Sequence, residues 1–195
     1  MSDLLTEALE RFESVYRRAR DLEPAAATRM ALATADSDGR PSVRTMRFTG
    51  LHDGGFSFFA NRTSGKGRQL EQNPWASLCF LWPDLRAQVV VGGRVATLPE
   101  AAADALWKAR PRAAALMAWA SEQSLEATDP NELGARYLEA SKRFTDERVP
   151  RPPDWLAYAV QPQRIEFWSG EWESRQHRDA YECVDGLWRY RHLNP

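Results

Sequence analysis

The chain has 195 residues and a formal net charge of −1, from 26 basic and 27 acidic side chains. This length suits one domain with a sizeable core, with or without helical attachments. The near-zero net charge excludes a general electrostatic attraction to nucleic acid or to an anionic membrane. Eight Trp residues supply bulky mass for a core or an interface.

The first residues, MSDLLTEALERF, carry acidic side chains where a secretion signal carries basic ones. No apolar run reaches membrane-spanning length, so we expect a cytoplasmic protein. Cys79 and Cys183 are far apart, and no CxxC motif or Cys/His ligand spacing accompanies them. The sequence therefore predicts neither a disulfide nor a metal site.

Hydrophobic periodicity predicts the elements in chain order. A helix is expected over residues 2–21, with apolar side chains at Leu5, Leu9, Phe12, Val15 and Tyr16. Apolar runs predict strands over residues 29–35, 42–49, 56–61, 75–82, 87–98, 155–160, 164–168, 180–184 and 187–192. Further helices are expected from Ser64 to Gln72 and over residues 100–108, 111–120 and 130–144.

Short links between most successive strands predict an antiparallel arrangement, because parallel strands need long crossovers. Asp53-Gly54-Gly55 and Asp185-Gly186 are typical of tight turns, and Gly92-Gly93 predicts a bulge within its strand. We expect a mainly β protein with helices, an α+β barrel or sandwich. Residues 1–24 form an N-terminal helix in this interpretation, and residues 25–195 form the main domain with a helical insertion at about 99–146.

A cationic cluster follows the second and third predicted strands. Ser64 is a suitable N-cap, and the small residues beside Lys66 let an oxyanion approach free backbone N–H groups. Arg44 lies on the preceding strand, and a guanidinium suits bidentate phosphate binding. The pattern predicts a phosphate clamp. The alternative is an ordinary surface helix that begins with Ser, Gly and Lys.

Two other polar groups stand out: Gln88 together with Gln123-Ser124, and the segment EWESRQHRD from Glu171 to Asp179. Each also has a structural interpretation, as a strand-to-loop hydrogen bond, a helix end or a solvated turn. The sequence has no GxSxG motif, no P-loop pattern and no GxGxxG motif after a strand. Composition and spacing thus predict a mostly antiparallel β protein that holds a phosphorylated aromatic ligand.

Several segments, in order from about residue 28 to the C-terminus, carry a family resemblance. They are RMALATADSDGRPSVR, FFANRTSGKGRQLEQNPWASLCFLW, QVVVG, Arg110-Pro111-Arg112, SEQS, RIEFW and WRYRHLNP. With these motifs the chain resembles the pyridoxamine/pyridoxine 5′-phosphate oxidase family. That family has an FMN-binding split β-barrel fold. The resemblance implies a homodimer with two FMN sites at its interface, no nucleic-acid or membrane partner, and O2 as the electron acceptor.

The resemblance also implies roles for individual residues. Arg44 and Lys66 would hold the FMN phosphate, with Ser64 nearby. The remaining implied cofactor contacts are Thr45, Met46, Arg47, Phe59, Ala60, Gln88, Gln123, Ser124, Trp168 and Arg178. Substrate contacts are implied at Thr49, Arg110, Arg175 and His177, and the last two would be the catalytic residues.

The substrate half departs from the family pattern. Of the family's phosphate-binding Lys, Tyr, Arg and Ser, only the Arg remains, as Arg110; the other positions hold Thr49, Leu106 and Ala114. Arg47 replaces the missing cation only if it faces the site. Arg175 and His177 match the family's Arg-x-His motif with gaps, whereas an ungapped alignment puts Ser174 and Gln176 there and keeps Arg178.

These departures favour an FMN-dependent oxidase of a reduced aromatic N-heterocycle other than a B6 phosphate. The segment KGRQLEQNPWAS and Leu106-Trp107-Lys108 resemble the flavin oxidases of phenazine biosynthesis. One alternative is a pyridoxamine/pyridoxine 5′-phosphate oxidase that makes pyridoxal 5′-phosphate. Another is a non-catalytic flavin or haem carrier, with His177 as the candidate axial ligand.

Overall fold

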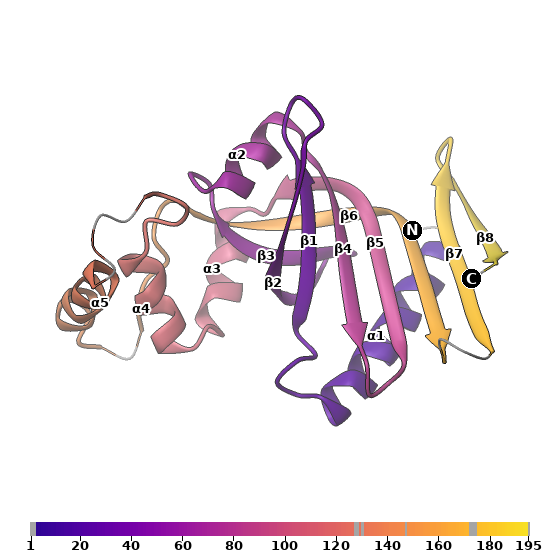
Figure 1. Ribbon diagram of the computed structural model, residues 1–195, viewed down its shortest axis with the longest axis horizontal. Helices are drawn as coiled ribbons and strands as arrows, with labels where there is room; N and C mark the ends of the chain where they lie inside the picture. The colour runs from indigo at the N-terminus through magenta and orange to yellow at the C-terminus, as the bar shows by residue number, and fades with distance from the viewer. Residues whose placement is uncertain (1–2, 127–128, 130, 147, 172–174, 195) are drawn as a thin grey trace.

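The fold is an antiparallel β-barrel with helices at its ends (Figure 1), as seen in a computed structural model that describes residues 3–126, 129, 131–146, 148–171 and 175–194. The strands lie in the order β3-β2-β1-β4-β5-β6-β7-β8, and an additional pairing of β3 with β6 closes the first six into a barrel. They are β1 (Arg29–Ala35), β2 (Pro41–His52), β3 (Gly55–Asn61), β4 (Trp75–Trp82), β5 (Ala87–Thr97), β6 (Trp155–Gly170), β7 (Gln176–Val184) and β8 (Leu187–Leu193). The α+β antiparallel barrel expected from the sequence is confirmed.

The two strands predicted over residues 155–160 and 164–168 are one strand, β6, in the structure. The polar segment around Pro162 suggested a break between residues 155–160 and 164–168, but one strand runs through it. The irregularity predicted at Gly92-Gly93 lies opposite, where the register jumps from Gly92↔Arg164 to Gly93↔Pro162, but the extra residue is Gln163 of β6 and not a residue of β5. A proline has no N–H to donate to the ladder, and the extra residue beside it, Gln163, forms a bulge within β6 that lets the pairing continue. A Cβ on Gly93 would lie 2.0 Å from the Gln161 carbonyl oxygen.

The two halves of β6 have different neighbours. Its first half pairs with β3 and closes the barrel, whereas its second half pairs with β7, which in turn pairs with β8. β7 begins at Gln176, four residues before the predicted start at Ala180. The charged segment after Arg175 is therefore largely strand and not a solvated turn.

Helix α1 (Asp3–Leu22) packs its apolar stripe against the barrel. Phe12 is fully buried, and its ring lies 4.7 Å from that of Phe56 and 5.1 Å from that of Phe80. The Arg11 guanidinium of α1 also forms an ion pair with Asp179 on β7, a strand near the C-terminal end of the chain. Aromatic burial and this ion pair together fix α1 against the sheet. Among the described residues, no helix combines the length and apolar character needed to cross a bilayer.

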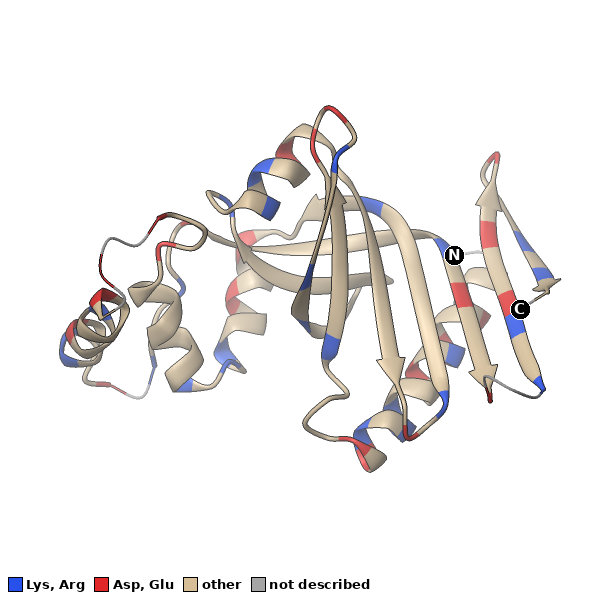
Figure 2. Cartoon of the chain, viewed as in Figure 1, with Lys and Arg blue, Asp and Glu red and all other residues tan. Residues whose placement is uncertain are grey.

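Three helices between β5 and β6 form one end of the molecule, opposite β7 and β8 (Figure 1). They are α3 (Glu100–Lys108), α4 (Arg112–Ala120) and α5 (Glu132–Arg143). A second apolar cluster joins them to the barrel through Trp107, Trp155 and Phe59. Central strands β4 and β5 carry few charges (Figure 2), and their side chains at Trp75 and Leu81 are 43% and 53% exposed.

Helix α2 (Gly65–Gln72) begins immediately after β3. As predicted, Ser64 is its N-cap, and the Ser64 hydroxyl accepts a hydrogen bond from the Gly67 N–H. The first turn lies directly on the end of β3: a Cβ on Gly67 would be 2.3 Å from the Arg62 carbonyl oxygen and 2.5 Å from that of Asn61. Only glycine permits this approach of helix to strand.

We expect Gly67→Ala to destabilise the protein by about 1–3 kcal/mol, because backbone must move to make room for the new methyl group. Gly65→Ala is the matched control. It adds the same atom in the same turn, meets nothing within 4 Å, and is expected to change stability by less than ~1 kcal/mol. Urea unfolding measures both free energies. Equal values for the two variants would contradict this account of how α2 is seated.

Candidate functional site

Arg44 is held from two sides at the end of the barrel nearest α2. Its Nη1 donates to the Thr34 hydroxyl at 2.6 Å and to the Leu32 carbonyl at 3.2 Å, both on β1. Its Nη2 donates to Gln69 Oε1 on α2 at 3.2 Å. All three partners are neutral, and among the described residues no carboxylate lies within ion-pair distance of Arg44. The guanidinium is therefore positioned without being neutralised.

Lys66 lies in the first turn of α2 and is only 7% exposed. Its Nζ is 2.8 Å from Gln123 Oε1 and 3.3 Å from the Ser64 hydroxyl. Burial, and secondly the nearby positive charge of Arg44, lower the pKa of Lys66 to about 8. Two cations at a helix start with only neutral partners form a site suited to an anion such as a phosphate.

Gln123 and Ser124 follow α4, and their segment reaches back to α2 through the Gln123–Lys66 hydrogen bond. Ser124 has a φ of +72°, a left-handed backbone conformation that few residues other than glycine adopt. Such strain persists only where the surrounding structure imposes it, and it concentrates at binding sites. The structure thus brings together four of the predicted cofactor residues: Arg44, Ser64, Lys66 and Gln123.

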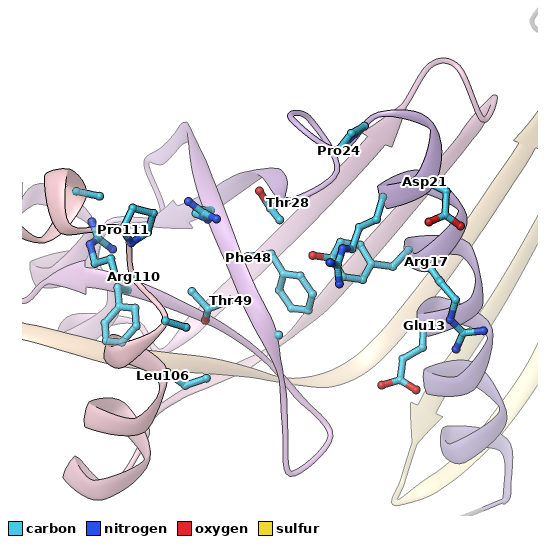
Figure 3. Close-up of a pocket in the computed structure, with 17 residues that line it drawn as sticks. Glu13, Arg17, Asp21, Pro24, Thr28, Phe48, Thr49, Leu106, Arg110 and Pro111 are labelled. Carbon is cyan, nitrogen blue, oxygen red and sulfur yellow. The ribbon is translucent and has the colours of Figure 1, made fainter. Parts of the chain in front are cut away.

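Two cavities that share several lining residues lie near this cluster. The larger opens between α1 and the α3–α4 link, with β2 between these elements (Figure 3). The larger, of about 970 Å³, is lined by α1, β2, β3 and the residues around Arg110. The smaller, of about 460 Å³, includes Gln123 and Trp155. Volumes of this size suit a small organic ligand. Predicted cofactor residues Thr45, Met46, Arg47 and Phe59 line the smaller cavity. Ala60 is buried in β3 and lines neither.

The predicted substrate positions lie together in the larger cavity. Thr49, Leu106, Arg110 and Ala114 all line it. The Thr49 hydroxyl is 2.9 Å from that of Ser57, so it already has a hydrogen-bond partner within the protein. Leu106 and Ala114 offer only apolar surface. Arg110 is thus the main polar contribution from these four positions.

Arg110 is held by two aromatic rings. Its guanidinium carbon lies 4.8 Å from the ring centre of Trp107 and 5.0 Å from that of Trp155. Its Nε is buried and has no hydrogen-bond partner among the described residues. Burial, and secondly the charge of Arg47, lower the pKa of Arg110. Arg47 lines both cavities, so it does face the site, which the sequence left open.

A second group of predicted residues lies elsewhere in the chain. Gln88, Trp168 and Arg178 stand directly opposite one another across β5, β6 and β7, and so share one sheet face. They line neither cavity. At about 4.8 Å per strand, Gln88 is roughly 14 Å along the sheet from β2. Arg178 donates to Glu166 Oε1 at 2.7 Å, so this arginine has a carboxylate partner. Within one chain these three predicted cofactor residues therefore line neither of the cavities beside the Arg44–Lys66 cluster.

The register of β7 separates the predicted catalytic residues from that group. His177 is opposite Ser169 and Arg178 is opposite Trp168, so His177 and Arg178 point to opposite faces of the sheet. Gln176, of the ungapped alignment, is on the same face as Arg178 and accepts a hydrogen bond from Trp168 Nε1 at 3.0 Å. Arg175 precedes the strand and is exposed. Ser174 lies outside the described residues.

Helix α1 contributes a wall that the sequence did not assign to the site. Tyr16, Arg17 and Arg20 line the larger cavity, together with the acidic Glu13 and Asp21. Glu13, Arg17 and Arg20 recur at helical spacing on the polar side of the helix, which is the signal in the sequence. The sequence does not show that the polar side of α1 faces the larger cavity, because this depends on tertiary packing. Thr34 and Gln69, the partners of Arg44, were missed for the same reason.

The lowered pKa of Lys66 gives the ligand-free protein a distinct pH dependence. The unfolded chain keeps this proton up to its ordinary pKa of 10.5, whereas the folded protein releases it near pH 8. Between these values the unfolded state binds more protons, so the free energy of unfolding rises with pH. We expect this rise in the wild type and its absence in Lys66→Met, measured by denaturant unfolding from pH 7 to 10. Parallel curves for both proteins would show that the ammonium is not strained by burial.

Comparisons with known proteins agree with this architecture. Residues 18–169 match the family model described as pyridoxamine 5′-phosphate oxidase. A pyridoxine/pyridoxamine 5′-phosphate oxidase of Anaeromyxobacter dehalogenans is 44% identical over 187 residues, which are 96% of this chain and 94% of the relative. One from Alkalilimnicola ehrlichii is 43% identical over 194 residues, with 98% and 99% coverage.

Two solved structures are similar over nearly the whole chain. PhzG from Burkholderia lata, in complex with tetrahydrophenazine-1-carboxylic acid, has a TM-score of 0.86 and 32% identity, and the match covers 95% of this chain and 91% of that one. An FMN-binding protein of Nostoc punctiforme shares the fold with a TM-score of 0.76, 22% identity and coverage of 95% and 96%. On the family match and these identities, the chain belongs to the pyridoxamine 5′-phosphate oxidase family and is an oxidoreductase of that family.

Proposed function

We propose that this protein is an FMN-dependent oxidase that passes a hydride from a reduced aromatic N-heterocycle to FMN, with O2 as the final acceptor. The observation that carries the proposal is the pairing of two sites. A cationic cluster at Arg44 and Lys66 suits a phosphate, and the adjoining cleft offers apolar surface at Leu106 and Ala114. Bound FMN would supply the redox chemistry, whereas the protein binds and orients both molecules.

The donors at the site fit the phosphate of FMN. Arg44 and Lys66 have only neutral partners among the described residues, and Ser64 adds a hydroxyl beside the free N–H groups at the start of α2. In this proposal Arg44 supplies a fixed fork and Lys66 a second charge. An arriving phosphate raises the pKa of Lys66 and keeps it protonated. Gln123 holds Lys66 in place and links it to the loop that carries Ser124.

A second copy of the chain completes the site in this proposal. Gln88, Trp168 and Arg178 share one sheet face that is separate from the cavities of their own chain. The neighbouring strand β4 has no charged side chain (Figure 2), and it exposes Trp75 and Leu81. Such an apolar face suits an interface between subunits. A homodimer that buries it would bring the second residue group of one subunit to the cavities of the other.

The substrate preference follows from the cleft. Thr49 is engaged with Ser57, and Leu106 and Ala114 have no hydrogen-bonding side chain, so these three positions offer no free donor to a phosphate dianion. An apolar planar ring with a smaller anionic group fits these walls better. The similarity to PhzG, which was solved with a reduced phenazine carboxylic acid, supports this choice. Oxidation of pyridoxine or pyridoxamine 5′-phosphate is the second candidate, which the names of the curated relatives favour.

Absorption spectra and a peroxide assay test the function directly. We expect purified protein to show the bands of oxidised flavin, and we expect peroxide release to be at least about tenfold faster with a reduced phenazine carboxylate than with pyridoxine 5′-phosphate. A tenfold ratio corresponds to ~1.4 kcal/mol of transition-state discrimination. Faster turnover of the B6 phosphate would establish the second candidate instead, and a flavin-free protein would contradict both.

Gln176 lies on the same sheet face as Trp168 and Arg178, whereas His177 lies on the other face, so we expect only Gln176 to contribute to turnover. We expect Gln176→Ala to lower kcat/KM by roughly tenfold, as the loss of one hydrogen bond of ~1.4 kcal/mol would. His177→Ala is the matched control because it removes a neighbouring side chain on the other sheet face. We expect it to leave kcat/KM unchanged within about twofold. The reverse result would support the gapped alignment, with Arg175 and His177 as the catalytic pair.

A further inference from the structure

The smaller cavity has a one-sided charge. Its lining includes three guanidinium groups, from Arg29, Arg47 and Arg110, and no Asp or Glu. Among the described residues, no carboxylate forms an ion pair with any of the three. Arg29 and Arg47 also stand directly opposite each other on β1 and β2, and like charges in that arrangement destabilise a sheet. Retaining three uncompensated cations around 460 Å³ of space is characteristic of a site for an anion.

Two of these cations bound both cavities. Arg47 and Arg110 line the smaller and the larger one, and the charge of Arg47 lowers the pKa of Arg110, after the effect of burial. The aromatic rings of Trp107 and Trp155 fix the Arg110 guanidinium, and its buried Nε has no partner among the described residues. An anion between Arg47 and Arg110 would relieve their repulsion and neutralise both.

The larger cavity beside this pair also offers apolar and aromatic surface. Leu106 and Ala114 line one side of the larger cavity and Tyr16 of α1 lines another. The Tyr16 ring is fixed by contacts with Phe48 at 5.3 Å and Trp82 at 6.2 Å between ring centres. The acidic side chains of the cavity, Glu13 and Asp21, come from α1, on the opposite side from Arg110 in Figure 3. The Arg110 side of the cavity is thus cationic, whereas the α1 side carries both acidic and basic side chains.

We propose that Arg47 is a specificity-determining residue, which together with Arg110 binds an anionic group on the edge of a planar aromatic substrate whose ring lies against Tyr16, Leu106 and Ala114. The inference rests on the proposed function and names its substrate class, an aromatic carboxylate or phosphate. Arg47 takes the place of the cation that is missing at Thr49, two residues further along β2. Arg47 and Thr49 both line the larger cavity, and Thr49 is the extra residue where the pairing of β2 with β3 shifts register.

Calorimetric titration of the FMN-saturated protein tests the role of Arg47. The probes are phenazine-1-carboxylate, its neutral isostere phenazine-1-carboxamide, and pyridoxal 5′-phosphate. We expect Arg47→Gln to weaken binding of the carboxylate at least tenfold, as loss of a charged hydrogen bond does, and to change carboxamide binding less than about twofold. Arg40→Gln is the charge-matched control, because Arg40 lies in an exposed turn and pairs with Asp38. We expect Arg40→Gln to leave the affinity for all three probes unchanged.

The carboxylate and the phosphate probe distinguish the two anionic groups that Arg47 could recognise on the substrate. A loss confined to the carboxylate identifies a ring carboxylate as the recognised group, and a loss confined to pyridoxal 5′-phosphate identifies a phosphate. Either result supports the role of Arg47. Unchanged affinity for both anions in Arg47→Gln would overturn it. A protein that retains no flavin, or forms no peroxide, refutes the proposed function alone, because titration of the flavin-free protein still measures the contribution of Arg47.

Discussion

Two positive charges held close together without a carboxylate are the constraint on which the site depends. Arg44 and Lys66 repel each other, and burial adds to the cost of keeping Lys66 charged. Neutral groups position both: Thr34 and Gln69 hold the guanidinium, and Ser64 and Gln123 hold the ammonium. A fold gains nothing in stability from this arrangement. In the proposed function an anion supplies the missing negative charge, and the phosphate of a flavin nucleotide is such an anion.

The barrel supplies the rigidity that this arrangement needs. Closure through β3 and β6 fixes the end of β3, and Gly67 lets α2 lie directly on that end. Lys66 therefore sits on a helix whose position is set by backbone contact. Arg44 projects from β2 toward the same helix. The bulge at Gln163, opposite Gly92-Gly93, allows β6 to continue past Pro162 and to carry Trp168.

Local sequence determines much of the fold. The predicted limits of β1, β4 and α3 agree with the structure, because turn or proline signals bound each of them. The break predicted in β6 was wrong because a bulge at Gln163 accommodates the polar segment around Pro162, and the local pattern does not reveal that pairing. For the site, residues within one hairpin and the next helix start were grouped correctly. The contacts of Arg44 with Gln69, and the α1 wall with Arg20, depend on tertiary packing that no local pattern encodes.

The account rests on recognition of a phosphate, and one comparison isolates that step. Flavin-free protein is titrated with FMN and with riboflavin, which differ only in the phosphate, and the quenching of flavin fluorescence gives both dissociation constants. Two charged hydrogen bonds of ~1.5–3 kcal/mol each predict that FMN binds more than about 100-fold more tightly. Equal affinities for the two flavins would contradict the account.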